Sequence, residues 1–87
     1  MRLKKDFILH DSDGDYVIVA VGEAAKNFHG LVHLNNVAGK IVEFLKDDIS
    51  EEELINKMLE VYDVDPDTLK KDVNNIVSQL KNANIVE

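Results

Sequence analysis

Three histidines are the side chains of this sequence best suited to acid–base or metal chemistry. They are His10, His29 and His33, and an imidazole can exchange protons or bind a metal ion near neutral pH. Two of them fall on or near neighbouring strands, but no second ligand stands at the helical or short-loop spacing that metal sites favour. We therefore predict neither a metal site nor a catalytic histidine, and His33 stays a candidate for lining a binding surface.

The aspartates between residues 11 and 15 resemble a calcium-binding loop at first sight. An EF-hand loop needs glycine at its sixth position and a bidentate acid at its twelfth. Counted from Asp11, however, Gly14 stands at the fourth position and Gly22 at the twelfth. Because Asp and Gly are the residues that tight turns use, this segment is predicted to be a turn.

Residues suited to covalent catalysis are scarce. The chain has no cysteine, which removes disulfides, thiolate ligands and cysteine nucleophiles together. No serine stands in a Gly-x-Ser-x-Gly context, and the four glycines are scattered and form no phosphate-binding loop. We therefore expect no catalytic residue and no cofactor, and a chain that binds a partner.

The charge of the chain is negative and unevenly distributed. The formal net charge is −7, and residues 37–87 hold twelve Asp and Glu against six Lys and Arg. An acidic surface repels phosphate backbones, which argues against a nucleic-acid partner. No apolar run reaches the length of a signal peptide or a membrane span, so we expect a cytoplasmic protein that does not enter a membrane.

The first third of the chain alternates in the manner of β-strands. Residues 7–10 and 16–21 flank the Asp-Gly turn, and this pattern predicts an antiparallel hairpin. A polar connection over 23–29 leads to a third strand candidate, residues 30–34. In that strand Leu31 and His33 are expected on one face, and Val32 and Leu34 on the other.

From Asn35 onward the apolar residues follow the helical period of about 3.6. Asn35 or Asn36 can cap a first helix. Ser50 with Glu53 is a capping-box signal for a second helix.

A third helix is predicted from the pair Asp65-Pro66 to about residue 83, because Asp can cap it and Pro suits its first position. Asn84 is expected to end it in a left-handed conformation, with Ile85-Val86 folding back on the body. Three strands followed by three helices predict an α+β fold with an antiparallel sheet. With 87 residues there is room for one core, so residues 1–87 are expected to form a single domain.

The order of these signals carries a family resemblance. The segments are Tyr16-Val17-Ile18 after a turn, Leu34-Asn35-x-x-Ala38, Ile49-Ser50-x-Glu52-Glu53-Leu54, Tyr62-Asp63-Val64-Asp65-Pro66, Asp72-Val73 and Leu80-x-x-Ala83-x-Ile85. Over residues 6–87 the chain resembles the PqqD family of pyrroloquinoline quinone biosynthesis and its relatives, the RiPP recognition elements that serve ribosomally made, modified peptides. Phe44 matches the aromatic residue of the family's first helix, whereas Asn27-Phe28-His29-Gly30 departs from its Gly-Gly-Lys-like turn.

The resemblance implies a winged helix-turn-helix fold, with three antiparallel strands packed on three helices. It also implies a function: capture of the leader segment of a precursor peptide. The leader adds a strand to the edge of the third strand and packs against the third helix. The domain then presents the peptide to a modifying enzyme, typically a radical S-adenosylmethionine (SAM) protein.

Carried onto this sequence, the resemblance gives eight candidate peptide-binding residues. The strand edge is formed by Leu31, Val32, His33 and Leu34, and the groove wall is the outward side of the third helix near Lys70, Val73, Asn74 and Val77. Leu31, Val73 and Val77 would make apolar contacts. Lys70 would meet leader carboxylates, and Asn74 would form a hydrogen bond. The apolar pattern of this helix nevertheless favours burial of Val73 and Val77 in the free domain.

Two other functions remain open from the sequence. A winged helix-turn-helix could bind nucleic acid through its third helix, although Lys70, Lys71 and Lys81 are offset by Asp67 and Asp72. The same strand edge could instead contact another protein or a second copy of the chain, which makes a monomer or a weak homodimer the expected state.

Overall fold

A three-stranded antiparallel sheet opens the fold. The structure is a computed structural model that describes residues 1–27 and 31–87. β1 (Phe7–Ser12) and β2 (Asp15–Ala20) form the predicted hairpin, and β3 (Leu31–Leu34) pairs antiparallel with β2. Asp13 and Gly14 have φ angles of 52° and 84°, the left-handed values that a two-residue type I′ turn requires. The predicted turn is thereby confirmed.

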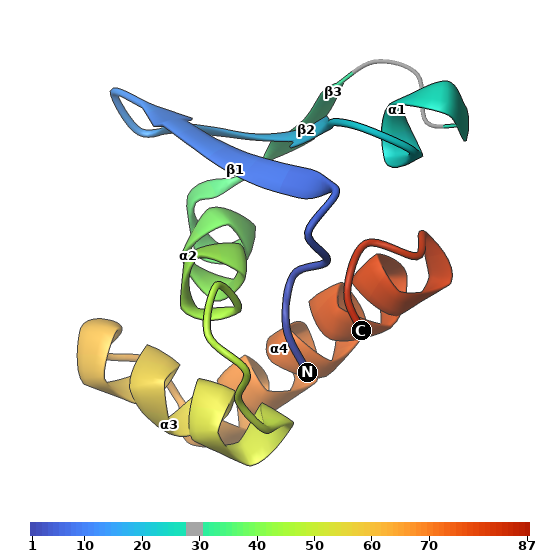
Figure 1. Ribbon diagram of the computed structural model, residues 1–87. Coiled ribbons are helices and arrows are strands. Elements are labelled where there is room, and N and C mark those ends of the chain that lie inside the picture. Colours follow the sequence, from blue (N-terminus) through green and yellow to red (C-terminus); the bar gives the residue numbers. More distant parts are fainter. Residues whose placement is uncertain (28–30) are drawn as a thin grey trace.

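Three helices lie on one side of the sheet, as Figure 1 shows. They are α2 (Asn36–Phe44), α3 (Glu51–Val61) and α4 (Pro66–Asn82), and their order after the strands confirms the α+β prediction. α3 and α4 are joined by a short turn, which is compatible with a helix-turn-helix corner. None of the described helices is both long and apolar enough to cross a membrane.

The helix between β2 and β3 was not expected. α1 (Ala24–Asn27) forms a single turn where the sequence predicts only a polar connection. Four residues are too few to show a helical period, and no capping signal marks this turn. The third strand begins at Leu31, while His29 and Gly30 lie outside the described residues.

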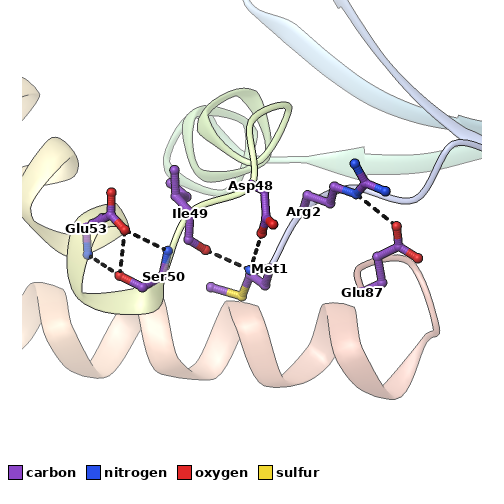
Figure 2. A network of polar contacts seen from close by, with 7 residues as sticks. All are labelled: Met1, Arg2, Asp48, Ile49, Ser50, Glu53 and Glu87. Carbon is purple, nitrogen blue, oxygen red and sulfur yellow. Dashed lines mark hydrogen bonds and ion pairs between the residues drawn. The ribbon is translucent and has the colours of Figure 1, made fainter.

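The longer helices begin at the residues that the capping signals predict. The Asn35 side chain accepts a hydrogen bond from the Ala38 backbone N–H at 2.8 Å. Figure 2 shows the capping box at the start of α3, in which the Ser50 hydroxyl accepts from the Glu53 N–H and the Glu53 carboxylate accepts from the Ser50 N–H. The Asp65 carboxylate caps α4 by accepting from the Thr68 backbone N–H at 3.1 Å, and Pro66 occupies the first helical position.

One apolar cluster fills the space between the sheet and the helices. Every strand residue in it points to the inner face of the sheet, and each long helix contributes one stripe. The buried members are Phe7, Leu9, Ile18, Ile41, Val42, Leu45, Ile49, Leu54, Met58, Leu69, Val73, Val77, Leu80, Ile85 and Val86. The sheet thus buries one face only.

The two ends of the chain lie side by side below the sheet (Figure 1). Leu3 and Val86 form an isolated antiparallel bridge, and the Arg2 side chain donates to the Glu87 carboxylate at 2.9 Å. Asn84 has a φ of 64°, the left-handed conformation predicted for it, and it reverses the chain after α4. The last residues consequently return to the core.

Candidate functional site

β3 forms one of the two edges of the sheet, and β1 forms the other. The strand order places β3 at an edge, with β2 as its one neighbour in the described part of the chain. An edge strand exposes N–H and C=O groups that another strand can pair with. The register of the hairpin decides which residues present those groups.

Hydrogen-bonded and non-hydrogen-bonded pairs alternate along an antiparallel ladder. The Val21 N–H donates to the Asp6 carbonyl at 2.8 Å, so the odd-numbered residues of β2 direct their backbone groups toward β1. The even-numbered residues of β2 then face β3, where their partners are Val32 and Leu34. Leu31 and His33 therefore direct their N–H and C=O groups to the free edge.

A groove runs beside this edge, on the inner side of the sheet. It has a volume of about 460 Å³ and separates β3 from α4. Its lining comes from β3, the start of α2, one side of α4 and the chain beyond it: Val32, His33, Leu34, Asn35, Ala38, Ile76, Gln79, Leu80, Ala83 and Ile85. None of these residues is Asp, Glu, Lys or Arg, and most of them are apolar, so the groove is mostly apolar.

The four strand residues predicted for the site are divided between two faces, as expected. Val32 and Leu34 are half-buried and line the groove, whereas the side chains of Leu31 and His33 are exposed on the opposite face of the sheet. All four lie at the predicted edge. Whether they bind a peptide remains a prediction.

The predicted wall on α4 is wrong for Val73 and Val77. These side chains are 0% and 2% exposed, because they point into the core and not toward solvent. Of the two apolar rows on this helix, Val73 and Val77 belong to the buried one. Their side chains therefore belong to the apolar core and do not line the groove.

Lys70 and Asn74 lie on the far side of α4 from the groove. The Asn74 amide donates to the Glu51 carboxylate at 3.4 Å, and Lys70 lines a shallow hollow with Glu51 and Ile55 of α3. Successive helical residues are about 100° apart, so Asn74 and Ile76 stand on nearly opposite sides of α4. Lys70 and Asn74 therefore do not line the groove beside β3, and their contacts with a peptide stay a prediction.

The groove wall on α4 is formed instead by Ile76, Gln79, Leu80 and Ala83. Ile76 is half-buried and Gln79 is exposed, and they follow the same helical side. The apolar stripe of α4 includes Ile76 and Leu80, so the sequence contains the signal, but it does not show which row faces the strand. Ile85 adds the floor because the chain folds back after Asn84.

His10 and His33, the histidines that the structure describes, lie on different strands. His10 and His33 both stand opposite Val17, one on either side of β2, so a full strand separates them. In the described residues no three His, Cys, Asp or Glu side chains form a group that could hold a metal ion. His29 lies outside those residues.

Two aromatic side chains, Tyr16 on β2 and Phe44 at the end of α2, have charged groups nearby. Partial burial, followed by the charges of Asp11 and Glu43, raises the pKa of the Tyr16 phenol. The Lys40 and Lys57 ammonium groups each lie 5.6 Å from the centre of the Phe44 ring, a cation–π distance. Phe44 is the last residue of α2, and its match to the family's aromatic position stays a prediction.

A family model decides the classification. The model described as "Coenzyme PQQ synthesis protein D (PqqD)" matches residues 8–86, nearly the whole chain. The chain belongs to the PqqD family. Among curated proteins none matches it.

Two solved structures share this PqqD-family fold. One is described as "TbiB1 in Complex with the TbiA(beta) Leader Peptide", with a TM-score of 0.80, 20% identity, and 100% of this chain and 95% of that chain covered. The other is "Lasso peptide synthetase B1 complexed with the leader peptide", with a TM-score of 0.70, 22% identity, and 94% and 91% covered. At these identities the similarity establishes the fold.

Proposed function

We propose that this chain is a non-catalytic peptide-binding protein that captures the leader segment of a ribosomally made precursor peptide. The leader adds a fourth strand to β3 and places alternate side chains in the groove against α4. The observation that carries this proposal is the free edge of β3 directly beside a mostly apolar groove. Such an arrangement is typical of peptide recognition by strand addition.

Two further observations support the proposal. The chain belongs to the PqqD family, and both similar structures contain a leader peptide. The surface of α4 does not favour the nucleic-acid alternative, since Lys70 and Lys71 are accompanied by Asp67 and Asp72 in a chain of net charge −7. A peptide ligand fits these features better than a phosphate backbone.

The bound leader would then be presented to a modifying enzyme, which we propose to be a radical SAM protein acting in the cytoplasm. In this scheme the domain supplies no reacting group. Its contribution is to raise the local concentration of the precursor at the enzyme.

Chemical-shift mapping tests the proposal. The probes are synthetic leader segments encoded by short genes beside the gene for this chain, each with a scrambled control. The expected result is a set of shift changes at residues 31–34 and on the Ile76–Ala83 side of α4, seen with a leader and not with its scramble. Changes confined to the Lys70 and Asn74 side, or none with any leader, would contradict it.

A further inference from the structure

The outer face of the sheet carries an apolar row that none of the described helices covers (Figure 1). Ile8, Val19 and Leu31 stand directly opposite one another across the three strands. Ile8 is 52% and Leu31 57% exposed, which places both among the most exposed large apolar side chains of the described residues. Figure 1 shows the helices on the other side of this sheet. The row ends at Leu31, on the edge where the proposed peptide docks.

The backbone register fixes where the side chains of an added strand point. Side chains directly opposite one another in a sheet lie on the same face. A peptide residue opposite Val32 or Leu34 must therefore point to the inner face and into the groove. A residue opposite Leu31 must point to the outer face, where it becomes the fourth member of the row formed by Ile8, Val19 and Leu31.

We propose that the site selects the peptide by its side chains on both faces of the added strand. The inference rests on the proposed function and adds a sequence class to it. The ligand is a segment with apolar side chains opposite Leu31, Val32 and Leu34, and an unrestricted residue opposite His33. Its signature is two adjacent apolar residues and a third two positions further on, or the reverse order for the opposite strand direction.

This signature differs from what the groove alone would select. A groove that contacts one face of the peptide strand selects apolar residues only at alternate positions. The adjacent apolar residue is required because Leu31 would otherwise remain exposed beside a polar neighbour. Continuity between the row and the docking edge identifies the occupant as the peptide itself, since each added residue extends a row that already crosses three strands.

A displayed library provides the test. Random peptides of about ten residues, long enough to pair with all of β3 in any register, are selected on the full chain and in parallel on its Leu31→Thr variant. Threonine keeps the strand propensity and removes the apolar surface. The wild type should enrich the three-residue signature. The variant should lose the requirement at the position opposite Leu31 and keep the other two.

Affinities of one enriched peptide sharpen the result. Leu31→Thr should weaken its binding several-fold, and the loss should disappear when the peptide's own outward apolar residue is also changed to threonine. Val61→Thr is the matched control, because Val61 is 48% exposed on α3, away from the sheet. It should change nothing.

The outcomes separate this inference from the proposed function. If apolar residues are enriched only at alternate positions, or if wild type and variant select the same signature, selection on both faces is overturned. Strand addition is not affected by either result. A sedimentation shift of the free chain caused by Leu31→Thr, without a change in selection, assigns the outer face to a second copy and also overturns selection on both faces. Selected peptides that bind an Ile76→Asn variant undiminished, or no enrichment at all, overturn both.

Discussion

At the scale of single residues, three positions along α4 separate a core side chain from one that borders the groove. Val73 is fully buried, whereas Ile76 is half-buried and borders the groove. A polar group placed at Val73 would lack a partner in the core and should unfold the chain. Val73→Asp would therefore test the stability of the fold and would reveal nothing about ligand contacts.

Ile76→Asn should weaken leader binding about tenfold or more, since a buried aliphatic side chain contributes about 1.5–3 kcal/mol. The free energy of unfolding should fall much less in the Ile76→Asn variant than in a Val73→Asn variant. Val61→Asn, an exposed apolar residue on α3, serves as the matched control. Calorimetry gives the affinities and urea denaturation the stabilities. Equal affinity for Ile76→Asn and the control would place the ligand outside the groove.

Gly39 allows α2 to pack closely against β2. It is buried in α2, and a Cβ at this site would overlap the ring of Tyr16 on β2. Gly39→Ala should destabilise the fold by about 1–3 kcal/mol despite the better helix propensity of alanine. In a Tyr16→Ala background the same change should be neutral or stabilising, because the clash is gone. Denaturation of the four proteins of this cycle measures the coupling, and additive effects would mean that the two elements do not approach this closely.

At the scale of elements, β3 offers a way to remove one backbone donor without touching the pairing with β2. The register directs the His33 N–H to the free edge and leaves Val32 and Leu34 to bond β2. Proline is tolerated on edge strands when its missing N–H faces solvent. His33→Pro should weaken leader binding about tenfold while the chain stays folded, and His33→Ala should bind nearly as well as wild type. Undiminished binding by a folded His33→Pro protein would rule out strand addition at this edge.

The elements that could be predicted from the sequence are those with local signals. Asp13-Gly14 marks the hairpin turn, Ser50 with Glu53 starts α3, and Asp65-Pro66 starts α4, because each signal acts through hydrogen bonds within a few residues. α1 has no such signal. Its single turn connects β2 to β3 along the chain, and only the tertiary structure could reveal it.

The candidate site could be predicted only in part, for a related reason. The edge position of β3 follows from the strand order, and the alternation of Leu31 and Val32 follows from a period of two. The side of α4 does not follow from periodicity, since the rows of Val73 and Ile76 fit the same helical period. Which row meets β3 depends on how α4 packs against α2 and the sheet, and that is a long-range property.

At the scale of the whole molecule, the first residues of the chain contact both the α2–α3 loop and the last residues. The amino group of Met1 donates to the Asp48 carboxylate and to the Ile49 carbonyl, both at 2.8 Å, just before α3 (Figure 2). The first residues then pair with the last ones through Leu3 and Val86. These contacts, called here the terminal clasp, place the first segment between the α2–α3 loop and the C-terminal residues. Those residues include Ile85, which forms the floor of the groove.

The charged part of the terminal clasp makes stability depend on pH in a predictable direction. The hydrogen bond from the terminal ammonium, together with its charge, lowers the pKa of Asp48 from the ordinary value of 3.8. A lowered pKa in the folded state means that the pair stabilises the fold above the unfolded pKa, and that this contribution disappears as the pH falls through the folded value. Asp48→Asn should therefore lower Tm near neutral pH, and the difference from wild type should shrink as the pH falls below the ordinary pKa of 3.8. Asp47→Asn is the matched control, because Asp47 makes no ion pair in the described residues. Thermal unfolding monitored by circular dichroism across this pH range measures both variants, and a Tm difference for Asp48→Asn that stays constant with pH would show that the ammonium–carboxylate pair does not stabilise the fold.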